Sequence, residues 1–288
     1  MQGKIVKGIA GFYYVECDGE VYECKARGIF RNRSEKPLVG DFVEFVKLEG
    51  QEGKGNVEAI LPRHSKLIRP EVANVDQALV VFASIDPAPD IHLLNRFLIS
   101  MESEDIPSII VLNKDDLKHE EDIPRIFQSA GYKVIQTSVK ENRGIEEVRE
   151  ILTGKTTAIA GPSGVGKSSL INTVAGRHVM ETGEISQKIK RGKNTTRHSE
   201  LITIGRNSYI LDTPGFASVD VPEIEKESLG WCFPEFVDHI PNCKFSGCSH
   251  RSEPSCGVKA ALEEGLITKE RYDDYVYFYN EIADRRKW

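Results

Sequence analysis

The stretch 156-TTAIAGPSGVGKSSLINTVAG-176 decides how the rest of the chain is interpreted. It contains the pattern Gly-x-x-x-x-Gly-Lys-Ser of a phosphate-binding loop. A β-rich run at 156–160 precedes the pattern and an apolar helical run at 170–175 follows it, which is the context that such a loop requires. Backbone N–H groups of the loop and the positive end of the helix bind phosphate. The predicted phosphate-binding residues are Gly161, Pro162, Ser163, Gly164, Val165, Gly166, Lys167, Ser168 and Ser169.

A magnesium site is predicted beside this loop. In the pattern, Lys167 reaches the β- and γ-phosphates of a nucleoside triphosphate and the Ser168 hydroxyl is a Mg²⁺ ligand. Asp212 ends the apolar strand in 208-SYILDTPG-215, where a carboxylate holds Mg²⁺ through water. The N–H of Gly215 is predicted to meet the γ-phosphate.

A second nucleotide motif, 111-VLNKDD-116, ends another apolar strand. A carboxylate at Asp116 can accept hydrogen bonds from N1–H and the N2 amine of guanine, whereas adenine would leave it unpaired. Asn113 is predicted to tie this loop to the phosphate loop, and the stem of Lys114 to cover the base. Ser138, in the next strand-like run, is predicted to support the base near O6.

The order of these motifs is unusual, because 155 residues precede the stretch 156–176 and the base-reading motif lies among them. The two base-reading segments come first, and the phosphate loop, the switch segment and the magnesium-binding aspartate follow. Small GTPases instead begin with the phosphate loop. Opening a closed α/β fold at a different loop gives this order without moving any residue in space. We therefore predict a circularly permuted GTPase domain.

The pattern of strands and helices predicts three domains. Residues 1–66 contain about five short strands, including a hairpin around Asp18-Gly19, and predict an OB-type β-barrel. Residues 70–218 alternate strands and helices, which is typical of a doubly wound α/β domain with a mostly parallel sheet. Residues 219–288 are mainly helical, and the stretch 63–70 is predicted to be a linker. An apolar stripe at 272–283 predicts a helix packed on a core.

Four residues near the C-terminus predict a metal site: Cys243, Cys248, His250 and Cys256. Three thiolates and an imidazole suit tetrahedral Zn²⁺, and no open coordination position is evident, so one structural zinc ion is expected. The metal would supply much of the folding energy of the small helical domain. The other cysteines, Cys17, Cys24 and Cys232, are predicted to be packed thiols.

Composition predicts a cytoplasmic protein. Apolar residues make up 40% of the 288 and the formal net charge is −6. The longest apolar run, 78–85, is far shorter than the ~18 residues of a membrane span, so we expect no membrane association. We expect a monomer.

Positive charge is concentrated in two stretches. Residues 25–36 carry five basic side chains against one acidic, and 187–206 carry six against one. Either stretch is compatible with a solvated surface or with RNA phosphates. The RNA-binding candidates are Arg27, Arg31, Arg33, Lys190, Arg191 and Lys193, with Phe30 as a stacking residue.

The whole chain resembles the ribosome-small-subunit-dependent GTPase family (RsgA, also called YjeQ). The resemblance rests on the motif order, the preceding barrel and the trailing Cys/His cluster. It implies Mg²⁺-dependent hydrolysis of GTP to GDP, stimulated by the 30S subunit, as a checkpoint or release step late in 30S maturation. It also implies contact with 16S rRNA and assigns zinc to the same four positions. By analogy with the family's Thr-Thr-Arg switch, Thr196 contacts Mg²⁺ and γ-phosphate, although Thr195 remains open.

Residue Phe216 follows the Asp-x-x-Gly motif, at a position where many GTPases have a glutamine that orients water. We therefore expect slow intrinsic turnover. Because the chain runs directly from Gly215 into the C-terminal domain, we hypothesise that the bound nucleotide repositions that domain through 216–230. Hydrogen exchange across 216–256 should then differ between the GTP-analogue and GDP forms.

Two other readings are open. A P-loop small-molecule kinase or ATPase would use the same phosphate loop, but the motif at 113–116 disfavours it. A passive RNA-binding module with a degenerate nucleotide site is disfavoured by the intact Lys167, Ser168 and Asp212. A preference for GTP over ATP would separate the leading reading from the kinase.

Overall fold

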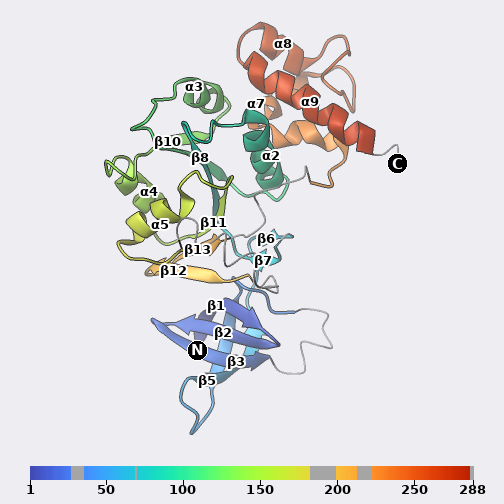
Figure 1. Cartoon of the computed structure of the whole chain (residues 1–288). Coiled ribbons are helices and arrows are strands. Elements are labelled where there is room, and N and C mark those ends of the chain that lie inside the picture. Colours follow the sequence, from blue (N-terminus) through green and yellow to red (C-terminus); the bar gives the residue numbers. More distant parts are fainter. Residues whose placement is uncertain (27–35, 69, 182–198, 213–221, 286–288) are drawn as a thin grey trace. The chain divides into compact units, whose positions relative to one another are not determined.

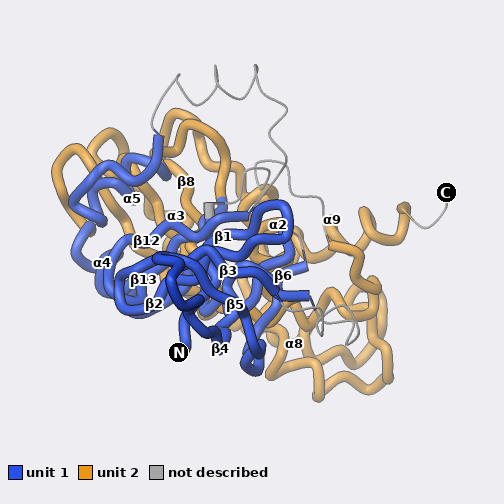
Figure 2. Tube along the Cα trace, turned by 90° about the horizontal axis from the view of Figure 1, so that it is seen from below, with its two compact units in different colours: residues 1–78, 145–160, 167–214 blue, residues 79–144, 161–166, 215–288 orange. Residues whose placement is uncertain are grey.

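The computed structural model describes residues 1–26, 36–68, 70–181, 199–212 and 222–285 (Figure 1). The chain divides into two compact units, drawn in blue and orange in Figure 2. The first comprises Met1–Ala78, Ile145–Ala160 and Lys167–Pro214, and the second comprises Leu79–Gly144, Gly161–Gly166 and Gly215–Trp288.

The N-terminal part of the first unit is a closed barrel with strand order β1-β2-β3-β5-β4. Its strands are β1 (Gln2–Ile9), β2 (Phe12–Cys17), β3 (Glu20–Ala26), β4 (Phe42–Lys47) and β5 (Lys54–Ile60). Asp18 and Gly19 form the two-residue turn between β2 and β3, with φ of 53° and 85°. Positive φ at both positions matches the twist of the hairpin strands. The predicted OB-type barrel is confirmed.

The segment predicted to be a linker packs onto this barrel. Its strand β6 (Lys66–Leu67) pairs with β7 (Val72–Ala73). Arg63 forms a two-pronged ion pair with the buried carboxylate of Asp41, at 2.6 and 2.8 Å. Composition alone did not reveal this, because a basic stretch next to a proline looks the same whether its arginine is solvated or paired with a buried acid.

The α/β part has a six-stranded sheet of order β10-β9-β8-β11-β13-β12. Its strands are β8 (Gln77–Ala83), β9 (Ser108–Asn113), β10 (Lys133–Gln136), β11 (Thr156–Ala160), β12 (Leu201–Gly205) and β13 (Ser208–Asp212). The pairs β10–β9 and β11–β13 are parallel, and β12 runs antiparallel to β13. Every residue of β8 is buried, as expected for a strand covered on both faces.

Amphipathic helices join these strands: α2 (Ile91–Glu102), α3 (Asp122–Ser129), α4 (Ile145–Leu152) and α5 (Lys167–Ala175). The Asp90 carboxylate caps α2 by accepting from the N–H of Leu93 at 3.0 Å. Such a cap satisfies one of the backbone donors left free in the first turn of a helix.

Polar contacts connect the barrel to the strands of its own unit. The ammonium of Lys4, in β1, donates to the hydroxyl of Thr156 at the start of β11 and lies over the rings of Phe42 and Tyr209. Burial lowers the pKa of Lys4 to about 8. The Glu16 carboxylate accepts from the Thr203 hydroxyl at 2.7 Å.

The C-terminal part of the second unit is helical, as predicted. It contains η1 (Lys226–Cys232), α7 (Pro234–Val237), η2 (Ile240–Asn242), α8 (Gly257–Glu263) and α9 (Lys269–Arg285). Tyr275, Tyr279 and Ile282 of the predicted stripe lie in a hydrophobic cluster with Phe233 and with Ile99 of α2. The stripe is therefore core packing, and the core extends to α2.

A buried ionic network also joins α2 to this part. Arg271, in α9, is 1% exposed and pairs with both carboxylate oxygens of Glu235, at 2.6 and 3.1 Å. Its guanidinium also donates to Asn95 of α2 and lies 4.5 Å from the ring centre of Phe233. Asn95 in turn donates to Asp274.

No helix in the described part of the chain is long and apolar enough to cross a membrane. The predicted packed thiols Cys17, Cys24 and Cys232 are all buried. The domain boundaries at 66, 70 and 218 stay predictions.

Candidate functional site

The predicted base-reading motif begins at the last residue of β9. Asn113 is 3% exposed, and its side-chain amide donates to the carbonyl of Val165, in the phosphate loop, at 2.9 Å. Its side-chain oxygen accepts from the Thr137 hydroxyl at 3.2 Å. The tie between base loop and phosphate loop that the sequence predicts is therefore present within the second unit.

Two glycines permit this close packing. A Cβ atom on Gly166, whose φ is 92°, would lie 2.4 Å from the side-chain nitrogen of Asn113. A Cβ atom on Gly161, at φ 135°, would lie 2.0 Å from the carbonyl oxygen of Val81 in β8. Both positions require glycine, for conformation and for space.

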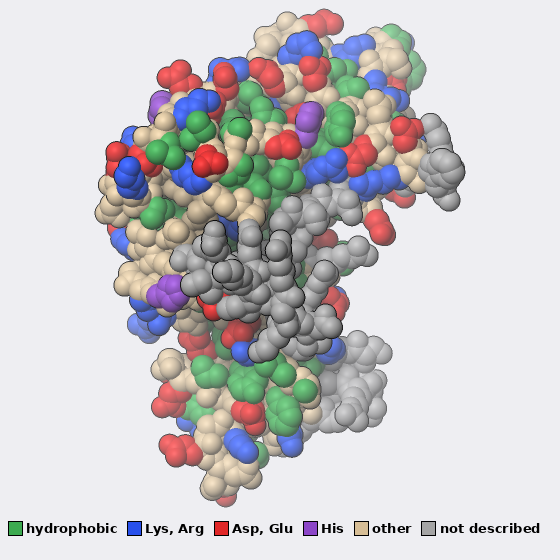
Figure 3. Space-filling view, viewed as in Figure 1, with side chains coloured by type: hydrophobic (Ala, Val, Ile, Leu, Met, Phe, Trp, Pro, Cys, Tyr) green, Lys and Arg blue, Asp and Glu red, His purple; other side chains and the backbone are tan. Residues whose placement is uncertain are grey.

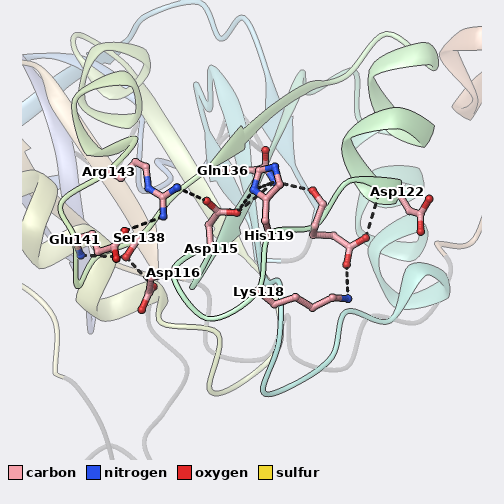
Figure 4. A network of polar contacts seen from close by, with 10 residues as sticks. Asp115, Asp116, Lys118, His119, Asp122, Gln136, Ser138, Glu141 and Arg143 are labelled. Carbon is pink, nitrogen blue, oxygen red and sulfur yellow. Dashed lines mark hydrogen bonds and ion pairs between the residues drawn. The ribbon is translucent and has the colours of Figure 1, made fainter.

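The Asp116 carboxylate lies beside Ser138, which follows β10 (Figure 4). The Ser138 hydroxyl donates to one Asp116 oxygen at 2.7 Å, and the Lys140 ammonium lies 3.9 Å from the other. The Ser138 hydrogen bond, helped by a backbone N–H and the charges of Lys140 and Arg143, lowers the pKa of Asp116. Asp116 is therefore ionised at neutral pH, which is the form that accepts hydrogen bonds at both oxygens.

Lys114 has a left-handed backbone, with φ of 65°, and its ammonium donates to the carbonyl of Asp86. Asp86 belongs to the loop that joins β8 to α2. This hydrogen bond holds the ammonium of Lys114 next to that loop, and the role of its stem in covering the base stays a prediction.

The phosphate loop joins β11 to α5, and Lys167 is the first residue of that helix. Lys167, Ser168 and Ser169 are half-buried, whereas Ser163 and Gly164 are exposed. Asp212 ends β13 and pairs in register with Ile159 of β11, two residues before Gly161. The backbone of Asp212 is therefore next to the strand end from which the phosphate loop leaves.

Several predicted residues lie outside the described part of the chain. They are the switch threonines Thr195 and Thr196, Gly215, Phe216 and the RNA-binding candidates Arg27, Phe30, Arg31, Arg33, Lys190, Arg191 and Lys193. Their roles stay predictions. On the face shown in Figure 3, the Lys and Arg side chains of the described residues are interspersed with Asp and Glu.

The four predicted metal ligands come together in the C-terminal part. The ligand atoms of Cys243, Cys248, His250 and Cys256 all lie within 4.8 Å of one another. His250 Nδ1 is 3.5 Å from the sulfur atoms of Cys243 and Cys256, which are 3.8 Å apart. Burial lowers the pKa of His250, so the imidazole is neutral at pH 7, the form that binds metal. The donor set fits a single metal ion.

The surrounding chain supports this cluster. The N–H of Gly257 points at the sulfur of Cys243 at 3.3 Å, and the Tyr272 hydroxyl donates to the carbonyl of His250 at 2.6 Å. The Glu253 carboxylate accepts from the backbone N–H and the hydroxyl of Ser249. Contacts of this kind orient metal ligands.

Sequence reasoning missed a set of side chains next to the base loop. Asp115, between Lys114 and Asp116, is buried and lies between Arg143 and His119 (Figure 4). Two adjacent aspartates after an apolar strand were the available signal. Since only one of them can face the base, the other needs a partner elsewhere in the chain.

Comparison with known proteins agrees with this geometry. The family model described as "RsgA GTPase" matches residues 60–222, and the "RsgA N-terminal domain" model matches residues 2–54. The chain belongs to the RsgA GTPase family. Its membership confirms the resemblance inferred from the motif order.

Full-length relatives are similar throughout. The small ribosomal subunit biogenesis GTPase RsgA of Agathobacter rectalis is 52% identical over 302 aligned positions that cover 100% of both chains. The Clostridium perfringens protein of the same name is 50% identical over 289 positions, covering 99% of each.

Two solved structures share the fold. YloQ, described as a circularly permuted GTPase, has a TM-score of 0.81 and 38% identity and covers 99% of this chain and 95% of its own. YjeQ from Thermotoga maritima has a TM-score of 0.82 and 36% identity, covering 98% of each. The prediction of a circularly permuted GTPase is thereby confirmed.

Proposed function

We propose that this chain hydrolyses GTP and acts in the biogenesis of the small ribosomal subunit. The observation that carries the proposal is the pair of ties around the base loop. Asn113 donates a hydrogen bond to the phosphate loop, and the ionised Asp116 accepts one from Ser138. Full-length relatives named small ribosomal subunit biogenesis GTPase support the biological role.

Guanine selectivity follows from the charge of Asp116. Its carboxylate accepts from N1–H and the N2 amine of guanine, and the neighbouring backbone at 138–140 meets O6. An adenine base offers a lone pair at N1 and no amine at C2, so it would leave the Asp116 carboxylate without these two donors. The unmade hydrogen bonds to this charged acceptor disfavour the binding of adenine.

Phosphate binding and hydrolysis are assigned to the loop 161–166, with Lys167, Ser168, Thr196, Asp212 and Gly215. The loop N–H groups and Lys167 are proposed to hold the phosphates, and Ser168, Thr196 and Asp212 to hold Mg²⁺. Mg²⁺ neutralises the charge that develops on the β- and γ-phosphate oxygens. Phe216 has no hydrogen-bonding side chain for the attacking water, so turnover by the chain alone is slow.

Zinc is the proposed occupant of the Cys/His cluster. Zinc–sulfur bonds of about 2.3 Å give tetrahedral edges of about 3.8 Å between sulfur atoms. The separation of 3.8 Å between Cys243 and Cys256 supports that size of ion. With four protein ligands the ion is structural, and it fixes the segment between η2 and α8.

The partner proposed is the 30S subunit, contacted in part through 16S rRNA. The barrel loop with Arg27, Arg31 and Arg33 and the switch stretch with Lys190, Arg191 and Lys193 supply the positive charge for such contact. The chain is proposed to act in the cytoplasm and as a monomer. The domains proposed are 1–66, 70–218 and 219–288.

Nucleotide turnover tests the proposal. The full chain is assayed with GTP and with ATP, each with and without purified 30S subunits. Slow GTP-selective hydrolysis that 30S subunits accelerate strongly is expected. Equal use of ATP would overturn the base assignment, and fast turnover without 30S would overturn the role given to Phe216 and to the partner.

A further inference from the structure

The carboxylate of Asp115 is enclosed, although it lies in a surface loop. Its side chain is 3% exposed. One oxygen is 2.9 Å from the guanidinium of Arg143 and the other is 2.6 Å from Nδ1 of His119. The Gln136 amide approaches the second oxygen at 3.4 Å. Arg143 and His119 are about half exposed, so the buried acid is the centre of the cluster.

Arg143 is itself fixed to the second base loop. Its backbone N–H donates to the carbonyl of Ser138, and its carbonyl accepts from the Ser138 N–H, both at 3.0 Å. The next residue, Gly144, has a φ of 70°, and a Cβ atom there would lie 2.4 Å from the carbonyl oxygen of Gln136. The loop from 138 to 143 is therefore closed at its base, with Arg143 directly across from Ser138.

Two side-chain bridges run between the base loops, beside the hydrogen bonds that Thr137 makes with Asn113 and with the N–H of Asp115. Asp116 accepts from Ser138, and the adjacent Asp115 pairs with Arg143, the residue bonded to Ser138. Figure 4 shows the side chains of Asp115 and Asp116 directed to these two different partners. The contacts of Thr137 fix the start of the second loop, whereas these two bridges fix the segment from Ser138 to Arg143.

We propose that Asp115 and Arg143 form a positioning pair that sets guanine selectivity. The inference rests on the proposed assignment of Asp116 to the base. The ion pair fixes the distance between the Asp116 carboxylate and the backbone at 138–140, so that N1–H, N2 and O6 of guanine meet their partners together. Neither residue touches the nucleotide.

A role in positioning differs measurably from a role in stability. Inosine diphosphate lacks the N2 amine, so the ratio of its Kd to that of GDP reports the Asp116 contact at that amine. A misplaced carboxylate lowers this ratio and weakens GDP binding. A pair that only stabilises the fold would lower the melting temperature and leave the ratio unchanged.

The test is a double-mutant cycle in the full chain with Asp115→Asn, Arg143→Met and the double variant. The Kd of GDP, inosine diphosphate and ADP is measured by titration, with a melting curve for each protein. Each single variant is expected to weaken GDP binding about 3- to 10-fold and to lower the inosine-to-guanine ratio. The double variant should bind GDP no more weakly than the weaker-binding of the two single variants, because each single substitution already removes the same bridge.

Lys118→Met is the matched control. It removes a cation from the same stretch, but its ammonium pairs with Glu120 and not with Asp115. We expect unchanged Kd values. Additive losses in the cycle, or an unchanged inosine-to-guanine ratio in both single variants, would overturn the positioning role.

Asp116→Asn separates this inference from the function beneath it. If that variant keeps the preference for GDP over ADP, the assignment of Asp116 to the base is wrong, and so is the positioning role of Asp115 and Arg143. If Asp116→Asn loses the preference while the cycle shows no coupling between Asp115 and Arg143, only the positioning role is wrong.

Discussion

The base loops at 113–116 and 137–143 differ from the Cys/His segment at 243–256 in what holds their functional atoms together. In the base loops each functional side chain has a protein partner: Asn113 has Val165 and Thr137, and Asp116 has Ser138. In the Cys/His segment three sulfur atoms and an imidazole nitrogen lie within 4.8 Å of one another. Thiolates and imidazole nitrogens stabilise one another little, whereas a metal ion bound between them would stabilise all four.

The difference has a physical consequence for order and ligand dependence. Protein–protein hydrogen bonds exist before a nucleotide arrives, so the base loops are preorganised and little ordering cost is set against binding. The cluster is expected to depend on a metal ion, because the binding energy of a metal held by four side chains contributes to folding. Each of the following experiments removes one element of that contrast.

Removal of the metal should have the largest effect. Chelation, or Cys256→Ser, is expected to destabilise the C-terminal part by several kcal/mol, up to about 10. Metal analysis shows that the ion has been removed, and melting followed by circular dichroism measures the loss of stability. Cys232→Ser is the control, since Cys232 is buried but lies outside the cluster. Unchanged melting after complete chelation would mean that packing alone holds the segment.

Arg271→Met tests whether contacts between protein side chains also stabilise the C-terminal part. The variant leaves the Glu235 carboxylate buried without its cation, which costs about 3–5 kcal/mol. Chemical denaturation followed by tryptophan fluorescence measures the loss. The double variant Arg271→Met/Glu235→Leu should recover most of it, because the Glu235 carboxylate is then no longer left buried without its cation. Lys269→Met, which breaks the exposed pair with Asp273 on the same helix, should change little.

Asp116→Asn should weaken GDP binding by about 100-fold, the equivalent of two hydrogen bonds to a charged acceptor. Xanthine carries an oxygen where guanine carries the N2 amine, so xanthosine diphosphate should bind the variant better than GDP does. Competition titrations with both nucleotides measure the reversal. Retention of the guanine preference would show that the base is read elsewhere.

Ser138→Ala should have the smallest effect, about 3- to 10-fold on GDP affinity. The Ser138 hydroxyl lowers the pKa of Asp116, so its loss raises that pKa towards the ordinary value. Binding needs the ionised form. Loss of GDP binding on acidification should therefore begin at a higher pH in the variant than in the parent chain. Superimposable pH profiles would argue against the hydrogen bond.

The sequence predicted the parts of this molecule whose patterns are local. The phosphate loop, the Asn113–Asp116 motif and the Cys/His spacing each lie within a short stretch, and the Asp18-Gly19 turn carries its own conformational signal. The predicted barrel, sheet and C-terminal helices followed from the same kind of pattern.

Features that depend on partners distant in the sequence were not predictable. Arg271 occupies the apolar face of α9 because Glu235 and Asn95 receive it, and they lie 36 and 176 positions away. Lys4 is buried because Thr156 and two rings surround its ammonium. The partner of Asp115, Arg143, lies on the next loop. A buried charge has no periodicity of its own, so only the fold identifies its counterpart.

Hydrogen exchange in the nucleotide-free chain, before and after chelation, tests most directly the claim that the base site is built by the protein alone. We expect protected amides at 113–116 and 137–143 in both states, and loss of protection at 243–256 on chelation. Rapid exchange in the base loops before any nucleotide is added, or protection at 243–256 that survives chelation, would contradict it.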